Sequence, residues 1–190
     1  MSGRRRINGY AIVSADGMIA DSRATMPDVL KNEADMRFFE RELNHVDVVV
    51  HGRHSHEGQA NSARRRRVAL TRAVAAIAPD PDNPKCVLWN PVGASFDDAC
   101  AALGLSNGVA AVIGGPQVYS LFLDIGYDGF CLSRAGEVEL PGGLPLFLQG
   151  RLGFSPEDTL RTFGLEPGST RTLDAANRVS LVCWRRKASA

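Results

Sequence analysis

An acidic residue and two aromatic residues, Asp35, Phe38 and Phe39, have the spacing with the clearest chemical use in this sequence. Positions i, i+3 and i+4 share one face of a helix, so the carboxylate is expected to lie beside both rings. A carboxylate placed there can bind a flat heterocycle through its adjacent N–H donors, and such hydrogen bonds are charge-assisted. Burial against the rings would raise the pKa of Asp35, which suits proton handling during reduction of an imine. The alternative is an acid that only complements the helix dipole.

Two apolar stretches each run into glycine, VDVVVHG at 46–52 and VAAVIGG at 109–115. We interpret both as a strand, a glycine turn and a helix. Glycine lets a ligand approach the backbone closely, and the free N–H groups of a helix start receive anions. One such junction is more often a plain tight turn, but two at one edge of a sheet suit the two phosphates of a dinucleotide. No GxGxxG follows the first strand, which excludes the common dinucleotide-binding motif.

Two charged clusters allow more than one interpretation. His51, His54, His56 and Glu57 form an HxxHxHE pattern, but no second Cys or His cluster completes a metal shell, so we expect no metal and a phosphate-adjacent or surface role. The four arginines at 64–67 indicate either the solvated face of a helix or recognition of a phosphate. Nucleic acid is a remote third interpretation, because one short basic run on a nearly neutral protein releases few counterions.

The elements that position these residues alternate between strand and helix. Strands are predicted at 7–14, 45–50, 85–89, 109–113, 129–133 and 178–186, and helices at 62–78, 96–103 and 116–123. A further helix begins after Asn32 as N-cap, with Met36, Phe39 and Leu43 on its apolar face. Pro116 suits a first helical turn. The sequence therefore predicts one α/β domain over residues 1–190, a mostly parallel twisted sheet covered by helices with an antiparallel C-terminal strand.

Composition narrows the class of protein. The chain has 190 residues, 22 Lys and Arg against 21 Asp and Glu, and 44% hydrophobic residues, which excludes a disordered or collagen-like chain. The four cysteines, Cys86, Cys100, Cys131 and Cys183, lie far apart in apolar stretches and are expected to be free and buried. The basic start MSGRRR is followed by no adequate apolar core, and no run reaches the roughly 20 apolar residues of a membrane span. We expect a cytoplasmic protein.

Several of these segments together resemble the dihydrofolate reductase superfamily, which includes the reductase domain of the riboflavin pathway. The resemblance is carried by GYAIVSADGMIAD, by the Met-Pro pair before a helix, by VVVHGRHSHEG and especially by VIGGPQVYSLFL. RVSLVCWRR resembles the closing strand of that family, and LPGGLPLF resembles its riboflavin-type and dihydrofolate-reductase-like branches. The resemblance implies the family fold, NADPH as cofactor, and hydride transfer to a C=N bond of a pteridine.

The resemblance also implies site residues. Cofactor-binding positions are Ile12, Ile19, Ala20, Gly52, Arg53, His54, Ser55, Gly114, Gly115, Val118 and Tyr119. Asp35 matches the catalytic and substrate-binding carboxylate, Phe38 or Phe39 the aromatic residue facing the substrate, and Ser133 a hydroxyl residue near that carboxylate. The arginines at 64–67 are then candidates for the 2′-phosphate of NADPH or for a substrate ribose phosphate.

The sequence departs from the family pattern beside the Met-Pro pair. Asp28 stands where the family usually has an aromatic residue, and the distance to the carboxylate is two residues longer, which leaves Asp28 and Glu33 as rival acids. Three functions follow: a pteridine reductase, a riboflavin-pathway reductase of a ribosylated aminopyrimidine, or a non-catalytic NADP(H)-binding protein. The resemblance to the riboflavin branch also favours a homodimer.

Overall fold

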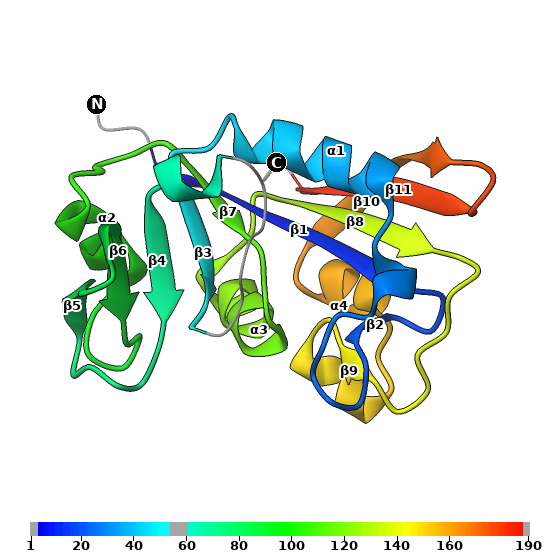
Figure 1. Cartoon of the computed structure of the whole chain (residues 1–190), viewed down its shortest axis with the longest axis horizontal. Coiled ribbons are helices and arrows are strands. Elements are labelled where there is room, and N and C mark those ends of the chain that lie inside the picture. The colour runs from blue at the N-terminus through cyan, green and yellow to red at the C-terminus, as the bar shows by residue number, and fades with distance from the viewer. Residues whose placement is uncertain (1–3, 54–60, 188–190) are drawn as a thin grey trace.

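A nine-stranded mixed sheet is the centre of the computed structural model, which describes residues 4–53 and 61–187 (Figure 1). The strand order is β10-β11-β8-β1-β7-β3-β4-β6-β5. The strands are β1 (Arg6–Ser14), β3 (Val48–Gly52), β4 (Arg67–Leu70), β5 (Ile77–Asp80), β6 (Asn83–Trp89), β7 (Val109–Val112), β8 (Gly129–Ala135), β10 (Leu165–Asp174) and β11 (Val179–Arg186). From β8 to β6 the neighbours run parallel, while β11, β10 and β5 are antiparallel to theirs. This arrangement confirms the predicted fold class.

Helices cover both faces of the sheet. The helices are α1 (Glu33–Leu43), α2 (Phe96–Ala102), α3 (Pro116–Ile125) and α4 (Pro156–Thr162). Figure 1 shows α1 on one side of the strands, with α3 and α4 on the other. Buried residues follow the same division, since Phe38 and Leu43 of α1 pack with Tyr10, whereas the larger cluster contains residues of α2, α3 and α4. Short β2 (Met18–Ala20) pairs with β9 (Leu144–Pro145) beside this sheet.

Local sequence explains the elements nearest to the candidate residues. Asn32 caps α1 as predicted, because its side-chain oxygen accepts hydrogen bonds from the backbone N–H groups of Ala34 and Asp35. Pro116 occupies the first turn of α3. On β1, Tyr10 and Ile12 face the α1 side and Val13 faces the opposite side, in agreement with the predicted alternation. The apolar face predicted for α1 is partly wrong, because Phe38 is buried and Met36 is 48% exposed.

The helix predicted at 62–78 is wrong. In its place the chain forms a 3-10 turn (Ser62–Arg64), then β4, and then β5 after an intervening bend. The apolar residues at 68, 70, 74 and 77 fit a helix face, but they also fit two short strands. Parallel pairing of β4 with both β3 and β6 decides between the two, because each neighbour supplies backbone hydrogen bonds to this short segment. Consequently the arginines at 64–67 are not a helix face, and Arg65 and Arg67 are buried.

The prediction that all four cysteines are free is also wrong. Cys131 on β8 and Cys183 on β11 face each other in the antiparallel register and form a disulfide, with 4.1 Å between their Cα atoms. Cys86 and Cys100 are free and buried, as predicted. The C-terminal region is more regular than its Pro- and Gly-rich sequence indicates, because it contains α4 and the ten-residue strand β10.

Candidate functional site

The two glycine turns meet at one edge of the sheet. The parallel strands β3 and β7 are neighbours, so their carboxyl ends lie together. The backbone N–H of Gly52 donates to the carbonyl oxygen of Gly114, with 2.9 Å between the two atoms. Gly114 is held at a φ of +126°, and the Gly114–Gly115 peptide is cis. Ligands of open α/β sheets bind at the carboxyl ends of the strands, which makes this edge the candidate site.

The amino end of α3 opens onto this edge without a side-chain cap. Gly115 is the N-cap residue, so the cap position itself supplies no side chain to accept a hydrogen bond from the first turn of the helix. Among residues 4–53 and 61–187, no atom lies within 4 Å of the position of a Cβ added to Gly115, so these residues leave the space in front of the backbone open. Val118 and Tyr119 are buried behind it. The open backbone and the first-turn N–H groups fit a phosphate of a bound nucleotide.

Tyr119 connects this turn to β1. Its hydroxyl donates to the backbone oxygen of Tyr10 at 2.6 Å, and its ring lies 3.4 Å from the position of a Cβ on Gly114. Burial raises the pKa of the Tyr119 hydroxyl, and the negative charge of nearby Asp35 raises it further. Tyr119 therefore stays protonated as a hydrogen-bond donor. Because the charge of Asp35 acts on Tyr119, and the Tyr119 ring adjoins Gly114, Asp35 lies in the neighbourhood of the glycine turns.

Asp35 lies in the first turn of α1 and faces Ser133 on β8. Burial raises the pKa of Asp35 above the ordinary aspartate value, and a hydrogen bond with the Ser133 side chain offsets part of that rise. Ser133 is itself almost fully buried. The two residues that the family resemblance pairs are thus brought together, and the carboxyl group is placed where it can hold or accept a proton.

The rival acids have a different environment. The side chain of Asp28 is 93% exposed and pairs with Lys31, whereas the side chain of Glu33 is 91% exposed and pairs with Arg37. The pKa of Asp28 is lowered by its hydrogen bond with Lys31. Asp28 and Glu33 therefore lie in solvent at the surface, and only Asp35 among these three acids is partly buried.

Both aromatic residues of α1 contact Tyr10, but they differ in access. The ring centroids of Phe38 and Phe39 lie 6.5 and 6.3 Å from that of Tyr10. Phe38 is buried and is covered by the guanidinium of Arg171 on β10, which lies 5.3 Å from the ring centroid. Phe39 is only partly buried. Phe39 is therefore the ring that a ligand can reach.

The remaining candidate positions lie on β1 and on the short strand β2 that follows it. Ile12 packs in a small cluster with Leu30, while Ile19 packs against the larger cluster on the other face of the sheet and Ala20 is buried in β2. These three residues consequently lie near one strand end without converging on one point. The loop is tied at Asp16, which accepts a hydrogen bond from the backbone N–H of Leu140.

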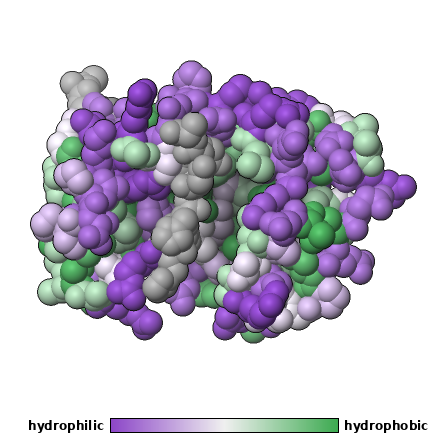
Figure 2. Space-filling view, viewed as in Figure 1, coloured by the Kyte–Doolittle hydropathy of each residue, from purple (hydrophilic) through white to green (hydrophobic). Residues whose placement is uncertain are grey.

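Arg134 holds the same loop from β8. Its guanidinium donates to the carbonyl oxygens of Ser14 and Ala15 at 2.9 and 2.8 Å and to Glu157 of α4 at 2.5 Å. A cavity of about 510 Å³ lies beside these contacts, next to the exposed Phe154. Figure 2 shows hydrophilic residues over most of the face turned to the viewer, with apolar residues both on the side that carries β2 and β9 and on the side that carries α2 and β5.

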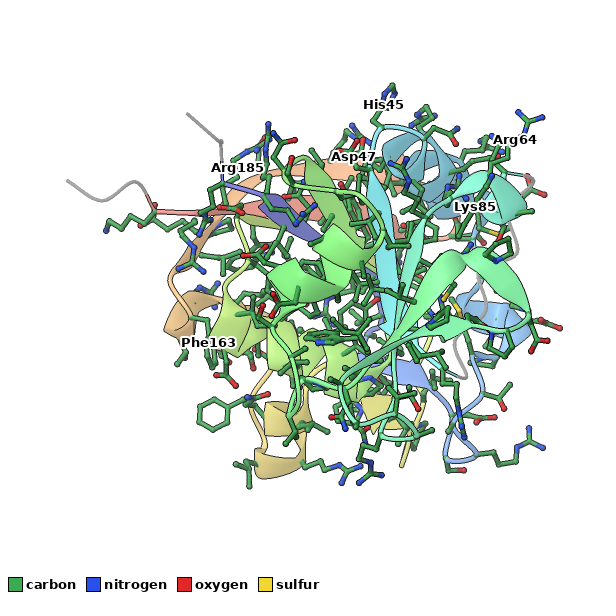
Figure 3. All side chains as sticks on the ribbon, turned by 90° about the vertical axis from the view of Figure 1, so that its left-hand side faces the viewer. His45, Asp47, Arg64, Lys85, Phe163 and Arg185 are labelled. Atoms are coloured by element: carbon green, nitrogen blue, oxygen red, sulfur yellow. A yellow bond between two sulfur atoms is a disulfide. The ribbon has the colours of Figure 1, made fainter. Side chains whose placement is uncertain are left out.

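The cations divide between the two edges of the sheet. The backbone N–H of Arg53 donates to the carbonyl oxygen of Leu70, so Arg53 follows β3 at the point where β4 ends, two residues before Arg72. Arg64 precedes β4 instead and lies at the opposite edge, where Figure 3 also shows His45, Asp47 and Lys85. Arg65 donates to the Asn44 side chain at the end of α1 at 2.8 Å. The run at 64–67 is thus separated from the glycine turns.

Arg72 was not among the predicted site residues, because 62–78 was predicted to be a helix and not a strand that ends before residue 72. A strand ending at Leu70 puts Thr71 and Arg72 at the carboxyl edge, beside Gly52 and Arg53. The signal present in the sequence was the short apolar run VAL followed by Thr and Arg. That pattern resembles the end of a buried strand as well as part of a helix.

Some predicted positions fall outside the described residues. His54 and Ser55 of the predicted cofactor turn lie in the segment 54–60, as do His56 and Glu57 of the histidine pattern. His51 is buried, and its Nδ1 lies 2.9 Å from the carbonyl oxygen of Gly52. Within residues 4–53 and 61–187, no group of three or more His, Cys, Asp or Glu side chains is placed to hold a metal ion. No helix in those ranges is long and apolar enough to cross a membrane.

The sheet order, the paired glycine turns and the position of α1 define a dihydrofolate reductase-like α/β fold. Three solved structures share it. A putative riboflavin biosynthesis protein from Shewanella sp. PV-4 has a TM-score of 0.65 and 20% identity, with 96% of this chain and 99% of that chain covered. Dihydrofolate reductase from Enterococcus faecalis, complexed with NADP(H) and RAB-propyl, has a TM-score of 0.63 and 17% identity, with 96% of each chain covered.

The third structure is a diaminohydroxyphosphoribosylaminopyrimidine deaminase and 5-amino-6-(5-phosphoribosylamino)uracil reductase from Thermotoga maritima. It has a TM-score of 0.63 and 17% identity, and the match covers 97% of this chain but 57% of that longer chain. No protein-family model matches the sequence, and no curated protein sequence matches it. The expected resemblance is confirmed at the level of the fold, which is shared with NADPH-dependent reductases, and the substrate has to be argued from the site.

Proposed function

We propose that this protein is an NADPH-dependent reductase that transfers a hydride to a C=N bond of a pteridine. The observation that carries the proposal is Asp35, a partly buried carboxyl group with a raised pKa that faces Ser133 beside the glycine turns. A raised carboxyl pKa next to an open, glycine-lined strand edge is the combination that proton-assisted reduction needs. The exposed rivals Asp28 and Glu33 lack both features.

Asp35 and Phe39 have complementary roles toward the substrate. Asp35 accepts hydrogen bonds from adjacent N–H groups of the flat heterocycle and holds a proton close to the ring nitrogen that becomes protonated. Ser133 fixes the carboxyl group in place, and the accessible face of Phe39 packs against the heterocycle. Tyr119 holds the middle of β1 against α3 through its hydrogen bond to the Tyr10 carbonyl oxygen, which maintains the distance between Asp35 and the turn at Gly114.

The residues at the strand edge fit NADPH. Gly52 and Gly114 form the adjoining turns, and Gly115 leaves open space before the start of α3, whose first turn, with Val118, offers N–H groups to the pyrophosphate. Arg53 and Arg72 lie at the ends of β3 and β4, where two cations can hold the 2′-phosphate. When bound, NADPH supplies the hydride, and the protein supplies orientation and the proton.

A specific observation favours a second substrate class, the ribosylated aminopyrimidine of the riboflavin pathway. Two of the three compared structures carry riboflavin or aminopyrimidine names, and their TM-scores equal or exceed that of the dihydrofolate reductase. Both substrates contain a flat heterocycle with N–H donors, so Asp35 can accept hydrogen bonds from either one.

NADPH oxidation measured with dihydrofolate, dihydrobiopterin and the aminopyrimidine separates these functions. Turnover on either pterin supports the pteridine reductase, and turnover on the aminopyrimidine alone transfers the proposal to the second class. Cofactor binding without turnover on any of the three contradicts both and identifies a non-catalytic NADP(H)-binding protein.

NADPH is expected to stabilise the protein more than NADH does. At a free ligand concentration 100 times its dissociation constant, binding adds about 2.7 kcal/mol to the free energy of unfolding. For a chain of this length that corresponds to a rise in melting temperature of about 5–10 °C. Arg53→Ala and Arg72→Ala should each reduce the preference for NADPH over NADH, because each removes a cation that we assign to the 2′-phosphate.

Thermal unfolding with each cofactor measures this preference. Arg64→Ala is the matched control, because Arg64 is exposed at the opposite edge of the sheet. Equal shifts with NADPH and NADH in the unmodified protein would contradict the cofactor assignment, and a loss of preference in Arg64→Ala would contradict the placement of the phosphate.

A further inference from the structure

The amino end of α1 is tied to the hairpin between β10 and β11 by one side chain, Asn32. Its Oδ1 accepts the backbone N–H groups of Ala34 and Asp35 at 3.0 and 3.2 Å. Its Nδ2 donates to Oδ2 of Asp174, the last residue of β10, at 2.9 Å. Asn32 therefore bridges the backbone of Asp35 and a carboxylate 142 positions away in the sequence.

The chemistry of an amide makes this bridge directional. An asparagine caps a helix only when its oxygen, and not its nitrogen, faces the first-turn N–H groups. A carboxylate accepts hydrogen bonds and donates none, so Asp174 can bond only the nitrogen side of the Asn32 amide. The contact with Asp174 thus selects the amide orientation in which Asn32 caps α1.

The β10–β11 hairpin also contacts α1 outside the Asn32–Asp174 pair. Figure 1 shows α1 lying over β10 and β11. A cavity of about 760 Å³ opens between the start of α1 and the hairpin, with Asn32 and Asp174 among its lining residues. A second contact between these elements lies further along α1, where Arg171 covers the ring of Phe38. Asn32 and Asp174 thus meet at the edge of a hollow, where their hydrogen bond joins the two elements.

We propose that Asp174 is a positioning residue for Asp35: by orienting the Asn32 amide it fixes the first turn of α1, and with it the carboxyl group that faces Ser133. The inference rests on the proposed function for the role of Asp35, but the connection itself can be measured without any turnover. Asp174, near the C-terminal end of the sequence, thereby acts on a carboxyl group near its N-terminal end.

Asp174 also has a local task that the experiment has to separate. It accepts hydrogen bonds from the backbone N–H and the side-chain nitrogen of Asn177, at 3.1 and 2.7 Å, and so stabilises the hairpin turn. Asp174→Ala removes both tasks. Asp174→Asn retains an acceptor oxygen for Asn32 but adds an amide donor, so it keeps the hydrogen bond and weakens only the selection of the Asn32 orientation.

A change at residue 32 distinguishes the two tasks. Asn32→Asp caps α1 with either oxygen, so it needs no orienting partner, but it places two carboxylates in contact. In the unmodified background Asp174→Ala should lower the melting temperature by about 2–4 °C, the usual effect of losing a helix cap in a chain of this length. In the Asn32→Asp background the same change should raise the melting temperature, because it removes the repulsion.

The effect on Asp35 is measured by carbon-13 NMR titration of its carboxyl group. In Asp174→Ala the titration midpoint should fall toward the ordinary aspartate value, because a loosened first turn exposes the carboxyl group to water. The double variant Asn32→Asp, Asp174→Ala should retain the raised value, and Asp174→Asn should give an intermediate one. Where the protein turns over a substrate, Asp174→Ala should raise its KM roughly tenfold and leave the NADPH-induced melting shift unchanged.

The outcomes distinguish the role of Asp174 in the hairpin, its link to Asp35 and the proposed function. If Asp174→Ala lowers the melting temperature equally in both backgrounds, Asp174 serves only the hairpin and the proposal is overturned. A sign change without any movement of the Asp35 titration overturns the link to the site. Absence of turnover on every substrate, with the sign change and the titration as expected, contradicts the proposed function and leaves the positioning role supported.

Discussion

Asp35→Asn is expected to lower the turnover number by about a hundredfold to ten-thousandfold, which is the range that general acid–base catalysis contributes. Asparagine has almost the same shape, but it lacks the anionic acceptor for the N–H donors of the heterocycle and cannot hold the proton. The melting shift on NADPH should remain unchanged, because we assign the cofactor contacts to the turns at Gly52 and Gly114 and none to α1. Steady-state NADPH oxidation and thermal unfolding measure the two effects separately.

The stability of the same variant gives an independent check. Burial raises the pKa of Asp35 in the folded protein, so the folded state binds this proton more tightly than the unfolded state does. Ionised Asp35 therefore lowers the stability of the fold once the pH rises above the ordinary value of 3.8 and through the raised folded value. Asp35→Asn removes that penalty, and at neutral pH the variant should be no less stable than the unmodified protein.

Asp28→Asn is the matched control for this substitution. Asp28 is exposed and contacts Lys31 alone among the charged residues that the structure describes, so its loss should have little effect on turnover. A large loss of turnover in Asp28→Asn, with Asp35→Asn active, would show that the acid of the site follows directly after Met26 and Pro27. The role of Asp35 would then be wrong.

The sequence was most informative where local and tertiary forces agree. The alternation on β1, the Asn32 cap and Pro116 at the start of α3 each depend on a few neighbouring residues, and all three were predicted correctly. The prediction failed at 62–78, where short apolar runs fit two structures and the parallel neighbours of β4 decide between them. The error also moved Arg72 away from the site in the prediction.

Features that depend on the register of distant strands could not be predicted. Cys131 and Cys183 are 52 residues apart and pair because β11 returns beside β8 in one particular register. The contact between Asn32 and Asp174 has the same origin, since it requires the hairpin after β10 to reach the start of α1. By contrast, the pairing of Asp35 with Ser133 was indicated by family resemblance, and the fold places both residues on facing elements.

Gly115→Ala is expected to abolish most of the stabilisation by NADPH while leaving the free protein intact. Gly115 has a φ of −81° and a ψ of −159°, an extended conformation that alanine adopts readily, and its added Cβ would meet no atom of the described residues within 4 Å. The fold therefore tolerates the methyl group. The same methyl group would occupy the open space in which we place the cofactor, in front of the first turn of α3.

The expected measurement is a melting temperature that is unchanged without ligand, together with a loss of most of the roughly 5–10 °C rise on adding NADPH. Gly104→Ala is the matched control, because its Cβ also meets open space but its φ is +72°. Alanine is strained at positive φ, so Gly104→Ala should lower the melting temperature of the free protein and retain the full NADPH shift. The opposite pattern, with a full shift in Gly115→Ala, would mean that NADPH does not approach the backbone at Gly115. The anion site would then have to lie elsewhere along the carboxyl edge, with Gly52 as the next position to test.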